Sequence, residues 1–188
     1  MFDKEAKLNE LAQVIEGRVV DDSDRVEVCI KGTVLGFPAT VEALRTNFPF
    51  GASFFLETDV LKEHKSQADQ QGFTLTISPK VVTGFWAKFS RILLIDHQTK
   101  MIGDKRFDSQ YLAVTNNDEE ARRFIKYPAM MDKIVLLSRT CSFTELHVRA
   151  GHGLVVVQPT SIEKLDGDVA RESFRVMGEI AQIMFEAF

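Results

Sequence analysis

The chain has 188 residues, of which 45% are hydrophobic and 27% are charged. A chain of this length and composition buries enough apolar surface to fold, which excludes disorder as its main state. Its formal net charge is −4, from 23 basic and 27 acidic residues, and this argues against a dedicated nucleic-acid binder, which carries a basic excess or stripe.

The first predicted element is a helix over residues 4–16. The apolar residues that recur at helical spacing in this range are Leu8, Leu11, Ala12 and Ile15. Gly17 follows, where a helix commonly ends on a left-handed residue, so we expect Gly17 to take that conformation.

We expect no segment that directs this chain to a membrane or out of the cell. The N-terminus lacks the basic-then-apolar order of a signal peptide, and no apolar run approaches the about 18 residues of a membrane span. The two cysteines, Cys29 and Cys141, are far apart, and we expect both to be buried free thiols. The predicted location is therefore cytoplasmic, without an integral membrane segment.

The first half then reads as a series of strands. They are predicted over residues 18–20, 26–31, 40–45 and 53–61, and the clearest alternates apolar Val26, Val28 and Ile30 with other residues. The connections between them are too short for parallel crossovers, so we expect an antiparallel meander.

Residues 63–72 form the most polar stretch and are the expected boundary between two halves. The next strand is predicted over residues 73–77, where Phe73, Leu75 and Ile77 alternate with threonines. Pro79 is expected to end this strand or to mark a sheet edge.

Residues 85–95 are amphipathic and favour a helix, although a strand remains an alternative because residues 92–95 are apolar throughout. The apolar side of that helix consists of Phe85, Trp86, Phe89, Ile92 and Leu93. Such a segment can cover the protein's own sheet, dock into a partner's groove or lie on a membrane surface. We name these five residues as a candidate interaction site.

The second half is predicted to mix strands and helices after a turn at Gly103-Asp104. Asn116 or Asn117 with Glu119 or Glu120 indicates a capped helix start. The expected elements are a strand over 107–115, helices over 118–126 and 128–138, a hairpin of strands 143–149 and 154–158, and a helix over 168–186.

The run Ile102-Gly103-Asp104-Lys105-Arg106-Phe107-Asp108, followed by Tyr111-Leu112-Ala113-Val114, resembles a loose group of bacterial proteins of uncharacterised function. In that group a Gly-Asp-x-x-Phe-Asp turn and strand precede a capped helix, a second helix and a hairpin. Residues 117–157 continue the same order. The resemblance implies no activity, and the membrane tether of many members is not carried over to this chain.

Asp104 and Asp108 are the first candidates for acid–base chemistry, with His97 nearby in the sequence. Carboxylates that are held close together can split their pKa values and serve as acid and base. The alternative for Asp104 is a turn residue that hydrogen-bonds its own backbone. We therefore predict no catalytic residues, and we keep Asp104, Asp108 and His97 as the site to test if the protein is an enzyme.

The histidines and cysteines suggest two further candidate sites, a zinc site and a nucleophilic pair. His147 and His152 flank one hairpin tip, and Glu145 shares a strand face with His147, but zinc requires three or four ligands. Cys141 with His147 is a conceivable nucleophilic pair, yet no flanking signature supports it. We expect exposed hairpin histidines, no metal site and no cofactor.

The predicted fold class is α+β, with a mostly antiparallel sheet, or sheets, covered by N-terminal, central and C-terminal helices. We expect a single domain over residues 1–188. This domain could consist of two similar halves. The 15 phenylalanines, against 1 tryptophan and 2 tyrosines, suit a dry core or a dry groove.

The function that these observations favour is a non-enzymatic binding or protein-interaction module with an unknown protein partner, or one that self-associates. No nucleic acid is expected as a partner. One alternative is an enzyme of unknown reaction that uses Asp104, Asp108 and His97. The other is a peripheral membrane or lipid-handling protein that acts through residues 85–95.

Overall fold

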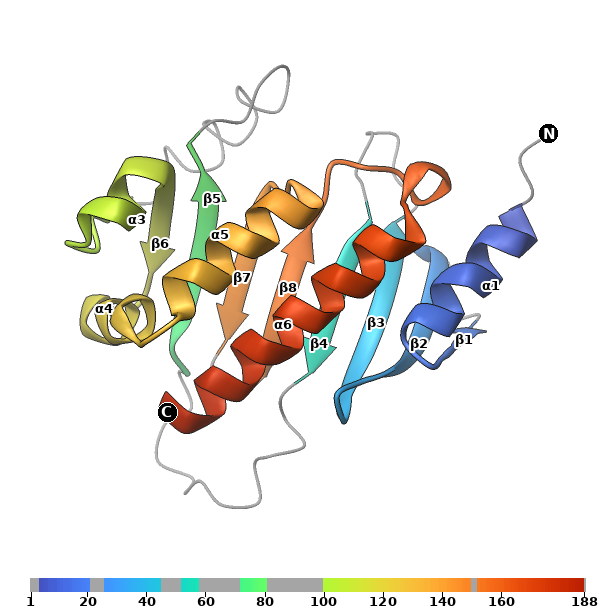
Figure 1. Ribbon diagram of the computed structural model, residues 1–188, viewed down its shortest axis with the longest axis horizontal. Helices are drawn as coiled ribbons and strands as arrows, with labels where there is room; N and C mark the ends of the chain where they lie inside the picture. Colours follow the sequence, from blue (N-terminus) through green and yellow to red (C-terminus); the bar gives the residue numbers. More distant parts are fainter. Residues whose placement is uncertain are drawn as a thin grey trace.

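One antiparallel sheet of eight strands organises the described part of the chain (Figure 1). The computed structural model describes residues 4–20, 26–44, 52–57, 72–80, 100–149 and 152–187. The strand order is β1-β2-β3-β4-β8-β7-β5-β6, and each adjacent pair is antiparallel. The predicted α+β class with an antiparallel sheet is confirmed.

The two halves of the chain contribute four strands each. The first four follow one another as the predicted meander: β1 (Arg18–Val20), β2 (Val26–Val34), β3 (Phe37–Leu44) and β4 (Ser53–Glu57). The others are β5 (Thr74–Pro79), β6 (Tyr111–Thr115), β7 (Glu145–Arg149) and β8 (Gly153–Val157). In this half the spatial order departs from chain order, because β5 lies between β6 and β7. The similarity of the two halves stays a prediction, since residues 63–71 lie outside the described residues.

Five α-helices accompany the sheet in the described ranges. They are α1 (Lys4–Val14), α3 (Lys105–Gln110), α4 (Asp118–Lys126), α5 (Met130–Cys141) and α6 (Gly167–Ala187), with the short 3-10 helix η2 (Ile162–Lys164) before α6. Figure 1 shows α1, α5 and α6 lying across the same face of the sheet. We call this the covered face.

A single row of side chains across the covered face forms the centre of the core. Its members pair from strand to strand and are each no more than 1% exposed: Ile30, Val41, Phe54, Val156, Leu146, Ile77 and Ala113. Phe54 stacks on Phe174 of α6, with 4.8 Å between the ring centroids. Burial of this apolar row is the main force that holds the helices on the sheet.

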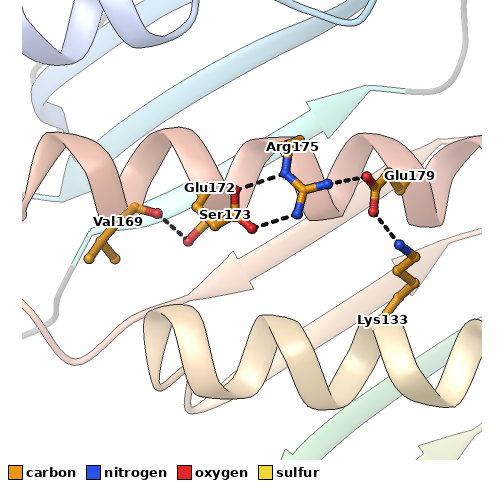
Figure 2. Close-up of polar contacts among 6 residues, drawn as sticks. All are labelled: Lys133, Val169, Glu172, Ser173, Arg175 and Glu179. Carbon is orange, nitrogen blue, oxygen red and sulfur yellow. Dashed lines mark hydrogen bonds and ion pairs between the residues drawn. The ribbon is translucent and has the colours of Figure 1, made fainter.

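Charged side chains join α5 to α6 at the outer edge of this interface (Figure 2). The Lys133 Nζ donates to the Glu179 carboxylate at 2.6 Å, and Arg175 donates to both Glu172 and Glu179. The hydrogen bond from Arg175 lowers the pKa of the Glu172 carboxyl. Of these contacts, only the Lys133–Glu179 pair crosses from α5 to α6, because the contacts of Arg175 lie within α6.

The strand expected over residues 107–115 is wrong for its first four residues, because α3 occupies Lys105–Gln110. Asp104 caps this helix by accepting a hydrogen bond from the Phe107 N–H at 2.8 Å. Phe107 is thereby turned into the core, where its ring lies 5.4 Å from that of Tyr111. A local side-chain hydrogen bond therefore overrides the strand preference of the sequence.

Most other predicted elements are confirmed with shifted ends. Asn117 caps α4 by accepting from the N–H groups of Glu119 and Glu120, although the Asn117 N–H donates to Thr115 and leaves the reciprocal bond of a capping box unmade. Helix α5 begins two residues later than expected and ends three residues later, at Cys141. The predicted hairpin is formed by β7 and β8.

The end of α1 differs from the prediction. The left-handed residue there is Glu16, with φ of 48°, and not Gly17. Glycine is needed at positions 17 and 32 for a different reason, because the chain after α1 lies directly on β2. A Cβ on Gly32 would stand 2.0 Å from the Ile15 carbonyl oxygen, which also accepts from the Thr33 N–H at 2.6 Å.

We predict that Gly32→Ala lowers the free energy of unfolding by about 1–3 kcal/mol, because the new methyl group must separate the end of α1 from β2. Urea denaturation of the full chain measures the change. Thr33→Ala is the control, since it alters an exposed side chain of the same strand and should cost less than about 1 kcal/mol. Equal losses in the two variants would contradict the close approach.

Candidate functional site

The face of the sheet opposite the covered face carries none of the five described helices (Figure 1). We call it the second face. Successive side chains of a strand point to opposite faces, so the neighbours of the core row lie here. Its half-buried apolar members are Phe55, Leu112, Val114, Val155 and Val157. Antiparallel sheets can keep one face available in this way, whereas parallel sheets are covered on both.

Three polar side chains form a hydrogen-bonded line in the middle of the second face. The Thr76 Oγ1 lies 3.0 Å from the His147 Nδ1, and the His147 Nε2 lies 2.9 Å from the Glu145 Oε2. The side chains of His147 and Glu145 are 28% and 24% exposed. Because Thr76 and His147 are cross-strand partners on β5 and β7, backbone pairing holds this line in place.

A pocket of about 450 Å³ opens where β5 begins and β7 ends. The polar side chains among its described lining residues are Thr74, Thr76, Asn116, His147, Arg149 and His152. Asn116 braces the rim, since its Oδ1 accepts from the Thr74 N–H at 2.8 Å and its Nδ2 donates to the Gly72 carbonyl. Arg149 gives this described lining a positive charge, and Glu145 lies next to its residue His147.

Asp104 and Asp108 are held by the backbone instead of facing each other as an acid–base pair. Asp104 caps α3, as the turn alternative predicted. The Asp108 carboxylate accepts from the N–H groups of Ile102 and Gly103 at 3.0 and 2.9 Å. His97, the third residue of the predicted enzyme site, lies outside the described residues.

Cys141 and His147 do not form the nucleophilic pair that the sequence left conceivable, because the two residues lie on opposite sides of the sheet. Cys141 belongs to α5 on the covered face, and its thiol donates to the Leu137 carbonyl at 3.2 Å. Burial raises the pKa of this thiol to about 11. Cys29 is also buried and outside any disulfide, and three strands separate β2 from β7 in the sheet. Neither thiol has the electropositive, accessible surroundings of a reactive cysteine.

The histidines of the β7–β8 hairpin come near the same pocket without making a metal centre. His147 lies half-buried with both ring nitrogens engaged, which differs from the exposed hairpin residue that we expected. His152 is exposed. Among the described residues, no three or more histidine, cysteine, aspartate or glutamate side chains are placed to hold a metal ion.

The five residues of the predicted interaction site, Phe85, Trp86, Phe89, Ile92 and Leu93, lie outside the described residues, and their role stays a prediction. Sequence reasoning missed Thr76 and Arg149. The alternation over residues 73–77 indicated that Thr74 and Thr76 share a face, but only the pairing of β5 with β7 brings them to His147 and Arg149. Within the described ranges, the helices are too short or too polar to cross a bilayer.

The fold and the second face together define a class: α+β proteins with one large antiparallel sheet and helices on one of its faces. No family model and no curated protein matches the sequence. The structure is similar to the crystal structure of the mycobacterial trehalose monomycolate transport factor A, with a TM-score of 0.61 and 9% sequence identity. The match covers 95% of this chain and 92% of that one, and at this identity it shows a shared fold.

We predict that neither cysteine of the native protein reacts with Ellman's reagent at pH 8 within minutes, because both thiols are buried and the Cys141 thiol stays protonated. Absorbance of the released chromophore is the measurement. The same sample in guanidinium chloride is the control and should release the signal of both thiols. Rapid release of one full equivalent from the native protein would contradict this placement.

Proposed function

We propose that this protein is a non-catalytic binding module that carries a lipid-like, amphipathic ligand on the second face of its sheet. The observation that carries the proposal is the group of half-buried apolar side chains on the adjacent strands β4 and β8, namely Phe55, Val155 and Val157. They lie on the face without described helices. A surface of this kind suits an extended apolar chain.

The carboxylates and thiols that the sequence offered for chemistry favour binding over catalysis. The carboxylates that the sequence offered for acid–base work, Asp104 and Asp108, hold backbone N–H groups. The thiols are buried. A general base or nucleophile requires a free, activated group within reach of a substrate, which these residues do not provide.

The shared fold supports the same proposal from a second direction. The protein with the similar structure is named a transport factor for trehalose monomycolate. Transport of a lipid requires a protein that binds apolar chains reversibly. We extend that type of role, and not that particular lipid, to this chain.

Apolar contact alone makes a weak complex on such a face. Burial of a methylene group is worth about 0.8 kcal/mol, so about ten methylenes with one side buried gain about 4 kcal/mol. That energy corresponds to a dissociation constant of about 1 mM. Useful affinity therefore requires a polar anchor for the ligand's headgroup.

The experiment that tests the proposed function is transfer of a fluorescent fatty-acid probe from vesicles to the protein. We expect Val155→Thr with Val157→Thr to weaken binding at least about tenfold, because hydroxyl groups that a lipid chain buries without partners cost about 1–3 kcal/mol each. Threonine keeps the shape of valine and its preference for strands.

The matched control is Val19→Thr, which makes the same chemical change on the edge strand β1, at a side chain that is 45% exposed. This variant should bind the probe as the wild type does. Unchanged transfer in the double variant, with urea denaturation showing that it is folded, would contradict a ligand on the second face.

The amphipathic segment 85–95 supports a related role at a membrane surface or at a protein interface. Trp86 is the only tryptophan of the sequence, so its fluorescence reports on this segment directly. If the segment contacts lipid, we expect a blue shift of Trp86 emission with anionic vesicles, and Trp86→Phe is the blank. An unchanged spectrum would leave a protein partner or self-association, which sedimentation of wild type and Trp86→Ala distinguishes.

A further inference from the structure

We propose that the pocket between β5 and β7 binds the anionic headgroup of the lipid-like ligand, a carboxylate or a phosphate, with Arg149 as its main contact. This inference rests on the proposed function, because it names the polar anchor that the ligand requires. Nothing in the fold or in the comparisons assigns this pocket a role.

The charges of the pocket select an anion. Arg149 ends β7 at the pocket with an exposed side chain, and no hydrogen bond or ion pair joins its guanidinium to another described residue. His147 and His152 also line the pocket. The guanidinium fork matches the oxygens of a carboxylate or phosphate, and such charge-assisted bonds are the strong ones.

The backbone leaves room beside Arg149. Its cross-strand partner on β8 is Gly153, which has no side chain and a φ of 148°. A Cβ at Gly153 would stand 2.2 Å from the Leu56 carbonyl oxygen, so glycine is required there by the packing against β4. Gly153 therefore places no side chain between the strand positions of Arg149 on β7 and Glu57 on β4.

Thr76 is a second donor whose direction depends on His147. Glu145 accepts from the Nε2 side of the ring. When Nδ1 is unprotonated it accepts from the Thr76 hydroxyl; when Nδ1 is protonated it donates to the Thr76 oxygen, and the hydroxyl hydrogen is then directed elsewhere. Protonation of His147 thus makes the Thr76 hydroxyl a donor to an anion in the pocket.

The surroundings of His147 support this coupling. On its own strand the ring faces Glu145 and lies on the same face as Arg149, while the neighbouring strands place Thr76 on one side and Val155 on the other. Backbone pairing between β5 and β7 therefore holds the His147 ring next to Thr76.

The position of the pocket also fits the path of an apolar chain. Val155 is the cross-strand partner of His147, and Phe55 is the partner of Val155. These two strand spacings cover about 10 Å, since neighbouring strands lie about 4.8 Å apart. A headgroup held at Arg149 and Thr76 therefore leaves its chain on the apolar side chains of β8 and β4.

The test is calorimetric titration of the 188-residue chain with decanoate, decanol and acetate at pH 7, where the decanoate carboxyl is ionised. We expect decanoate to bind at least about tenfold more tightly than decanol. Acetate, which lacks the chain, should bind far more weakly.

Substitutions at Arg149 and Thr76 test which side chains contact the headgroup. Arg149→Gln should remove the preference for decanoate over decanol, a loss of about tenfold for one charge-assisted bond. Arg171→Gln makes the same charge change at an exposed position of α6 and should leave the preference intact. Thr76→Val should keep decanol binding and weaken decanoate binding, which a merely structural role of Thr76 would not do.

The outcomes separate the two proposals. Equal binding of decanoate and decanol would overturn the headgroup site and leave the proposed function standing. Binding of neither would count against both. Acetate binding as tight as decanoate would overturn a lipid source, because the pocket would then take a free anion.

Discussion

The pairing of β4 with β8 is the contact on which the rest of the structure depends. It brings Ser53–Glu57 against Gly153–Val157, two segments far apart in the chain, and joins two groups of four strands into one sheet. Without it, the core row would stop at Phe54 on one side and at Val156 on the other. Helix α6 would then lose the continuous surface on which it lies, because Phe174 packs directly on Phe54. Non-local pairing of this kind carries a loop-closure cost that only the burial of both rows offsets.

The same pairing also shapes the second face. On the covered face it places Phe54 beside Val156, and on the other it places Phe55 beside Val155. One face is dry because α1, α5 and α6 lie on it. The other keeps half-buried apolar groups next to the line of Thr76, His147 and Glu145. An apolar strip that ends in a pocket lined by Arg149 is the arrangement that suits an amphipathic ligand, and it exists only because both halves share one sheet.

The residues that the sequence suggested for catalysis have structural roles. Asp104 and Asp108 accept from N–H groups around α3, and Cys141 is buried in α5, where its thiol donates to the Leu137 carbonyl. The N–H groups of Ile102 and Phe107 are partly buried and would lack a partner without these carboxylates, which is costly. Thr76 and Arg149, by contrast, looked ordinary in the sequence. Their proposed role depends on the residues that strand pairing places beside them, and the local sequence pattern does not show which residues those are.

The sequence by itself determined the α+β class, the antiparallel meander of β1 to β4, the β7–β8 hairpin and the helices α1, α4, α5 and α6, because each depends on periodicity, caps and turns within a short stretch. The sequence-based prediction was wrong at residues 107–110, where the Asp104 cap produced a helix in place of a strand. It was also wrong at the end of α1, where Glu16 and not Gly17 is left-handed. Gly17 is glycine because its backbone packs closely on the backbone of β2. The order β4-β8-β7-β5-β6, the separation of Cys141 from His147 and the meeting of His147 with Thr76 were decided only by the tertiary structure. The physical reason is that these contacts form when apolar side chains from segments far apart in the sequence are buried together. The apolar pattern within one segment does not show which other segment it will pair with.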